Sequence, residues 1–175
     1  MFIHKGDLYV LAASTELGDL LIGKSDDGGK TFGTPTVLLR GSGRNRQAGV
    51  HKSPQNVVRY KVRIYETLEW GAGDQGYHAA MVMSCDENDD LLVAENWHLS
   101  APVKYDRHWK GVPEGISSGT MEGTLTVFPD GKLYNVMRYD MSRLTPDRGL
   151  VIAYKVNDEN PDAPLEFSHV IKIAV

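Results

Sequence analysis

Short apolar runs recur along nearly the whole chain, separated by polar turn segments. Runs rich in Val, Ile, Leu, Tyr and Thr, bounded by Gly, Pro, Asn and Asp, are typical of β-strands. We expect strands at residues 2–3, 8–11, 20–24, 36–40, 55–59, 62–70, 78–84, 97–100, 150–156 and 165–167. No apolar run with a period of 3.6 is long enough to predict a helix, although residues 91–94 fit either a short strand or a helical turn. The pattern predicts an all-β chain.

Residues 119–140 predict the best-defined element, a β-hairpin that reads GTMEGTLTVFPDGKLYNVMRYD. Pro129, Asp130 and Gly131 suit a three-residue loop, in which Gly131 takes the left-handed conformation. That loop sets Phe128 opposite Lys132.

Counting back along both strands then sets Glu122 opposite Arg138, on the same face. Gly119 and Gly123 are expected to leave room around the acid. A slip of one residue would break this pairing, so it depends on the turn type.

The strand pattern repeats three times. Tyr9, Tyr65 and Tyr134 each follow a turn and begin a strand, and each is followed by another strand and an acidic turn. The repeats somewhat exceed the usual ~40–50 residues of a propeller blade. We expect a β-propeller segment of about three four-stranded blades, near residues 1–48, 49–117 and 118–175. Propellers close with ~4–8 blades, so the segment belongs to a larger protein or self-associates with another copy to complete the ring.

Composition excludes several classes of partner. The net charge of −4 and the absence of a basic cluster argue against nucleic acid and anionic membranes. Cys85 is the single cysteine, so the chain has no intramolecular disulfide and no multi-cysteine zinc site. No run approaches the ~18 apolar residues of a membrane span. The N-terminus lacks the zones of a signal peptide, which leaves the compartment open, including secretion or a periplasmic location for a longer parent.

The segment Ser25-x-Asp27-x-Gly29-x-Thr31-Phe32 resembles the Asp box (BNR repeat) of the sialidase, or neuraminidase, superfamily. Physically it predicts a compact turn in which Ser and Asp oxygens bind backbone N–H groups, Gly takes an unusual φ and the aromatic ring packs underneath. In that family the box is a folding motif, remote from the active centre.

The hairpin resembles the same family, in which a Glu opens a strand and the return strand carries an Arg before Asn or Tyr. The resemblance implies that Glu122 activates a tyrosine nucleophile, and that Arg138, with Tyr139 beside it, helps to hold the substrate carboxylate. It therefore implies a sialidase-like glycoside hydrolase of the exo-α-sialidase type, which acts without a cofactor on a glycan or small acidic sugar.

The chain departs from the family in one early motif. The tripeptide Arg-Ile-Pro is absent, and residues 51–54, His-Lys-Ser-Pro, are its nearest counterpart, one blade before Glu122. The nucleophilic Tyr, the acid/base Asp and the third arginine are not placed, and would lie in other blades. The competing class is a carbohydrate-binding or structural propeller that kept the box and lost catalysis.

Further candidates come from aligning the blades. When the second blade is aligned with the third so that Tyr65 matches Tyr134, Glu69 matches Arg138. We therefore expect Glu69, His51 and Lys52 to reach the central funnel as substrate-binding residues. The structural alternatives are an ordinary ion pair between Lys52 and Glu69, and a partly buried salt bridge for Glu122 with Arg138.

Aromatic and histidine residues complete the candidates. Trp109 is the candidate platform for a sugar ring, whereas Trp97 is expected to pack between blades. His78, His98 and His108 lack metal-ligand spacing, so no metal site is predicted.

Overall fold

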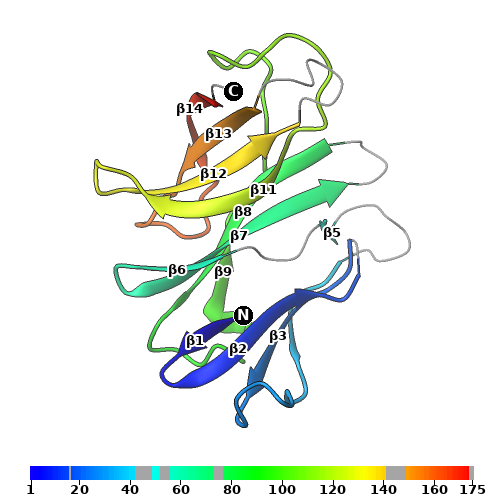
Figure 1. The fold of residues 1–175 in the computed structure, drawn as a ribbon, viewed down its shortest axis with the longest axis vertical. Helices are drawn as coiled ribbons and strands as arrows, with labels where there is room; N and C mark the ends of the chain where they lie inside the picture. Colours follow the sequence, from blue (N-terminus) through cyan, green and yellow to red (C-terminus); the bar gives the residue numbers. More distant parts are fainter. Residues whose placement is uncertain (16, 42–48, 52–55, 73–76, 141–148, 174–175) are drawn as a thin grey trace.

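The computed structural model describes residues 1–15, 17–41, 49–51, 56–72, 77–140 and 149–173, in which three antiparallel sheets follow one another along the chain (Figure 1). The first sheet has the order β1-β2-β3-β4. Its strands are β1 (Phe2–His4), β2 (Asp7–Ala13), β3 (Leu20–Ser25) and β4 (Thr36–Leu39). Each strand pairs with the next along the chain, as in a propeller blade.

The second sheet is built on two ten-residue strands, β7 (Arg63–Ala72) and β8 (Tyr77–Asp86). Its outer strands are β5 (Gly49–Val50), β6 (Val57–Tyr60), β9 (Trp97–Leu99) and β10 (Val103–Lys104). Both β5 and β6 pair with β7, and both β9 and β10 pair with β8. The sheet is therefore four positions wide, with each edge position divided between two short strands.

The third sheet has the order β11-β12-β13-β14. Its strands are β11 (Thr120–Val127), β12 (Leu133–Tyr139), β13 (Gly149–Lys155) and β14 (Glu166–Ile173). Within the described ranges the helical content is one turn of 3₁₀ helix, η3 (Ala94–Asn96), and no helix there is long and apolar enough to cross a membrane. The predicted all-β class is confirmed.

The second sheet is buried on both faces, between the first and third sheets (Figure 1). Along β8, Met81 and Met83 join a core cluster with Leu11 and Ile22 of the first sheet. Val82, between them, joins a second cluster made mainly with the third sheet. Because successive side chains of a strand point to opposite faces, the unbroken apolar run of β8 supplies both clusters. This succession of packed four-stranded sheets is a β-propeller segment of about three blades.

A buried polar contact joins the second and third sheets. The Thr67 hydroxyl donates to Asn135 Oδ1 at 2.9 Å, and Asn135 Nδ2 donates to the Met81 carbonyl at 3.2 Å. Gly123 lies against this contact, since a Cβ there would stand 2.4 Å from Thr67 Oγ1 and 2.6 Å from Asn135 Oδ1. The prediction that Gly123 leaves room around the acid is wrong, because the neighbouring sheet fills that space.

The turn after β3 forms the hydrogen bonds predicted for it. Asp27 Oδ1 accepts from the backbone N–H groups of Lys30 and Thr31, both at 2.9 Å, and Ser25 Oγ accepts from Gly29 N–H at 2.8 Å. The Thr31 hydroxyl, which donates to Asp27 Oδ2, and the hydrogen bonds from the Thr31 N–H, the Ser25 hydroxyl and the Lys30 N–H favour the ionised carboxylate and lower the pKa of Asp27 to about 2. Phe32 packs only in part: its ring lies beside Gly23 of β3, and its side chain is 38% exposed.

Candidate functional site

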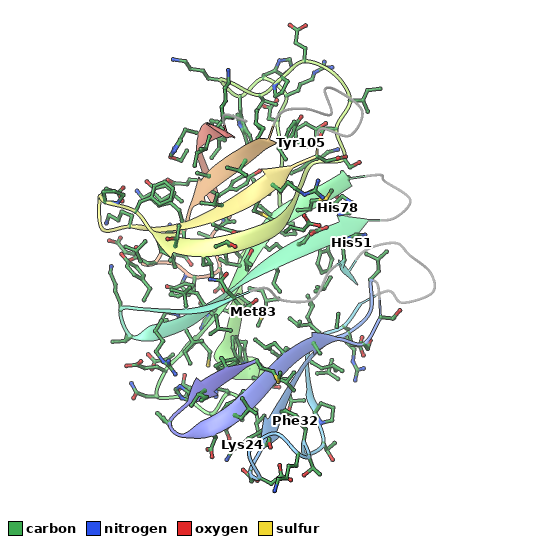
Figure 2. The ribbon with its side chains drawn as sticks, in the orientation of Figure 1. Lys24, Phe32, His51, His78, Met83 and Tyr105 are labelled. Atoms are coloured by element: carbon green, nitrogen blue, oxygen red, sulfur yellow. The ribbon has the colours of Figure 1, made fainter. Side chains whose placement is uncertain are left out.

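Several strands place polar side chains at one common end of the second and third sheets. His51 directly follows β5, Glu69 lies near the end of β7, and His78 lies near the start of β8. Glu122 near the start of β11 and Arg138 near the end of β12 lie at the same end of the neighbouring sheet. Figure 2 shows His51 and His78 next to each other there. The site is thus built on strands and, at His51, on the residue that follows one.

Two imidazoles converge on the carboxylate of Glu69. Its Oε1 lies 2.8 Å from His51 Nδ1 and 2.9 Å from His78 Nδ1, and the two rings stand 4.3 Å apart at 73°. The Glu69 side chain is only 4% exposed, whereas those of His51 and His78 are 23% and 17% exposed. These three residues are one cluster with a buried carboxylate and partly accessible imidazoles.

Strand register explains how the cluster forms. The His51 N–H donates to the Glu69 carbonyl at 3.0 Å, which sets the two residues side by side. Glu69 pairs with Ala80, and His78 lies two positions from Ala80 on β8. Residues two apart on a strand share a face, so Glu69 and His78 meet on one face of the sheet.

Gly119 lets the third sheet approach this cluster. It forms a parallel bridge with His78, and a Cβ on it would lie 2.3 Å from the His78 carbonyl oxygen. The adjacent Ser118 carbonyl accepts from the His78 N–H at 2.6 Å. Gly119 therefore makes room for the backbone of β8, and the predicted space around the acid is again filled by the neighbouring sheet.

Glu122 connects the two sheets through its backbone. Its N–H donates to Glu69 Oε2 at 3.0 Å, and its φ is +55°, a left-handed conformation that is uncommon for a residue other than glycine. This conformation sits in a β-bulge between Met121 and Thr124. The buried carboxylate of Glu69 thus holds Glu122 in place.

The bulge changes the predicted register. The predicted loop is present, because the Phe128 N–H donates to the Lys132 carbonyl at 2.9 Å and Gly131 has φ +74°. Beyond the bulge, however, Met121 and not Glu122 stands opposite Arg138. The predicted direct pairing of Glu122 with Arg138 is wrong by one residue, because the extra residue of a bulge shifts the ladder.

The predicted contact between the two side chains nevertheless forms. Arg138 Nε donates to Glu122 Oε2 at 2.6 Å, and Arg138 Nη2 lies 2.6 Å from Met121 Sδ. The side chains of Arg138 and Glu122 are 46% and 37% exposed. A guanidinium carries five N–H donors, and among the described residues these two contacts engage Nε and Nη2.

Two further predicted binding residues pack in or against the core of the third sheet. Tyr139 is 2% exposed, packs edge-on against Tyr105 at 5.4 Å between ring centroids, and has a pKa raised mainly by burial. Trp109 stacks on Phe167 at 4.3 Å and meets Tyr154 edge-on at 5.9 Å. For Tyr139 the prediction of sugar contact is corrected to a packing role. Trp109 is only partly buried, so its contact with a sugar stays a prediction. Lys52 lies outside the described residues.

Sequence reasoning placed His51 and Glu69 at the site and missed His78. The missing information was the register of β7 and β8, which brings residues nine positions apart onto one face. A search for short ligand spacings in the sequence does not detect such a pair. Trp97 packs as expected, since it is buried and its Nε1 donates to the Leu91 carbonyl at 2.9 Å.

Comparisons with known proteins support the fold. A scan against protein-family models finds no match, and a search of curated proteins finds none either. Among solved structures, a crystal structure of alpha-L-arabinofuranosidase from Lactobacillus brevis superposes with a TM-score of 0.62 at 19% sequence identity. The match covers 96% of this chain and 56% of that chain, so this chain spans just over half the length of that protein. At this identity the likeness concerns the fold, a β-propeller.

Proposed function

We propose that this chain forms part of a β-propeller glycoside hydrolase that acts on a terminal acidic sugar, in the manner of an exo-α-sialidase. The observation that supports it is the half-exposed pair of Glu122 and Arg138, anchored from beneath by the buried Glu69. The structural neighbour, an alpha-L-arabinofuranosidase, supports a glycosidase in general. The acidic sugar is inferred from the exposed guanidinium.

Arg138 is the group that would bind the substrate. Its guanidinium stays charged, and its planar fork matches the two oxygens of a carboxylate. The contact with Glu122 through Nε holds the guanidinium in one orientation. A hydrogen bond to a charged group contributes about 1.5–3 kcal/mol. Loss of the contact between Arg138 and the substrate carboxylate would therefore weaken binding of an acidic sugar about 10- to 100-fold.

Glu122 is the group that would take part in the reaction. A non-glycine residue in a left-handed conformation costs about 1–3 kcal/mol, and such residues cluster at functional positions. Here the bond from its N–H to Glu69 offsets part of that cost. By resemblance to sialidases, the Glu122 carboxylate would accept the proton of a tyrosine nucleophile supplied by another blade.

A complete funnel needs more blades than the three sheets described. Propellers close with ~4–8 blades. We therefore propose that further blades of a longer chain, or a second copy of this chain, complete the ring. Light scattering gives the solution mass, and a mass of two copies together with binding of an acidic sugar would support self-association.

The test measures the hydrolysis of two fluorogenic glycosides by the assembled protein. An α-sialoside should be cleaved, whereas an uncharged α-L-arabinofuranoside should not. Glu122→Gln should abolish hydrolysis and keep both the fold and the binding of a sialic acid analogue. Arg138→Lys should raise KM. The control Arg40→Lys, in the exposed pair with Asp19, should change neither KM nor kcat.

The alternative outcomes separate the candidate functions. Binding of the analogue without hydrolysis, lost in Arg138→Lys, would indicate a carbohydrate-binding propeller. Cleavage of the arabinofuranoside alone would keep the glycosidase and refute the acidic sugar. A Glu122→Gln variant that unfolds would show that the pair with Arg138 is a structural salt bridge.

A further inference from the structure

We propose that His51, Glu69 and His78 bind a divalent transition-metal ion of the Zn²⁺ class. One ligand atom from each residue lies within 4.8 Å of the others. Two imidazoles and one carboxylate form a ligand set found in catalytic zinc sites, which keep a further position for water or substrate. The inference does not depend on the proposed glycosidase activity.

The distances suit a small cation. Tetrahedral ligands at about 2.0–2.1 Å from Zn²⁺ lie about 3.3 Å from one another. The Oε1 of Glu69 lies 2.8 Å and 2.9 Å from the two Nδ1 atoms. Opening each separation by about half an ångström, within the reach of small rotations of the side chains, would admit the ion.

The contact between Glu69 and His78 does not have the geometry of a hydrogen bond. Within the part of the chain that is described, neither Glu69 Oε1 nor His78 Nδ1 makes a hydrogen bond of acceptable angle, although the atoms are 2.9 Å apart. Buried polar atoms without a well-aligned partner call for an explanation, and a bound ion is one. A cation bound between Glu69 Oε1 and His78 Nδ1 would be coordinated by a lone pair from each atom.

The surroundings hold the ligands in position. Glu69 Oε2 accepts the N–H of Glu122 at 3.0 Å, which orients the carboxylate and leaves Oε1 facing the imidazoles. Hydrogen bonds of this kind behind a metal ligand raise affinity. Imidazole nitrogen favours Zn²⁺ and its neighbours in the first transition row over Mg²⁺ or Ca²⁺, which prefer oxygen.

The site lies beside the proposed substrate site. The carboxylate that would bind the ion through Oε1 also holds the backbone of Glu122 through Oε2. The partial exposure of His51 and His78 leaves a path for a water molecule or a sugar oxygen to a further coordination position. An ion here would add positive charge next to Arg138, where an anionic ligand is expected.

Metal titration of the chelator-treated protein tests the proposal. Calorimetry with Zn²⁺ should show one ion per chain, and Co²⁺ should give the visible absorption of a four-coordinate site. His78→Gln and His51→Gln should each weaken Zn²⁺ binding at least tenfold while the circular dichroism spectrum is preserved. His98→Gln is the matched control, because His98 pairs with Asp162 in an exposed contact at 3.0 Å, away from the three ligands.

Two results would overturn the inference. One is the absence of stoichiometric Zn²⁺ and Co²⁺ binding by the folded protein. The other is binding that His78→Gln and His51→Gln leave unchanged, which would place the ion elsewhere. Glu69→Gln is less decisive, because the carboxylate is buried and its change can affect folding. The two histidine variants therefore decide the test, and if one of them fails to fold, the other still gives a result.

Discussion

Replacing Gly123 with alanine should specifically loosen the contact between the second and third sheets. The added Cβ would stand 2.4 Å from Thr67 Oγ1, 2.6 Å from Asn135 Oδ1 and 3.1 Å from Met137 Cγ, all far shorter than van der Waals contact. Overpacking of this kind costs about 1–3 kcal/mol. Displacing Thr67 from Asn135 would also break a buried hydrogen bond, which adds about 1–2 kcal/mol.

The total loss should therefore be about 2–5 kcal/mol, a large part of the ~5–15 kcal/mol that stabilises a typical domain. Urea unfolding followed by circular dichroism measures it. Gly131→Ala is the control, because nothing lies within 4 Å of a Cβ there and only its φ of +74° opposes the substitution. That control should cost about 1–2 kcal/mol.

A double-mutant cycle with Thr67→Ala identifies the cause. Removing the Thr67 hydroxyl should relieve the closest clash, so the double variant should be more stable than the sum of the single changes predicts, by at least about 0.5 kcal/mol. If Gly123→Ala costs no more than Gly131→Ala, or if the two changes are additive, then the sheets do not meet at this point and the reasoning fails.

Three further predictions follow from burial and hydrogen bonding. The pKa of Asp27 is lowered from 3.8 to about 2, so the ionised carboxylate stabilises the fold above pH 4, and this contribution should disappear between pH 4 and 2. The midpoint temperatures of thermal unfolding of the protein and of the Asp27→Asn variant should then converge as the pH falls. The Cys85 thiol is buried, and burial raises its pKa to about 11, so a thiol reagent should label it only after unfolding, and rapid labelling of the native protein would contradict the packing. Trp109→Ala should destabilise the third sheet, because the ring packs on Phe167, and Trp109→Phe should keep the affinity for a sialic acid analogue if packing is the role of the ring. A large loss of affinity in a folded Trp109→Phe variant would support the predicted sugar platform instead.

Local physics determined the features that the sequence predicted correctly. Short runs of apolar and β-branched residues between turn residues marked the strands, and the Pro-Asp-Gly loop at 129–131 fixed the hairpin turn. The turn around Asp27 was predicted for the same reason, since its hydrogen bonds join residues within four positions of one another. The contact between Glu122 and Arg138 survived the register shift because both side chains are long enough to span it.

Tertiary structure decided what depends on residues far apart in the chain. The bulge at Glu122 exists where β11 meets Glu69 of another sheet, and no local pattern signals it. Tyr139 is buried and Trp109 is partly buried because neighbouring elements pack on them, although both stand in segments whose sequences also suit a surface. His78 joins the candidate metal site through the pairing of β7 with β8. A sequence specifies which face of a strand a residue shares with its near neighbours, but only the assembled sheets determine what that face meets.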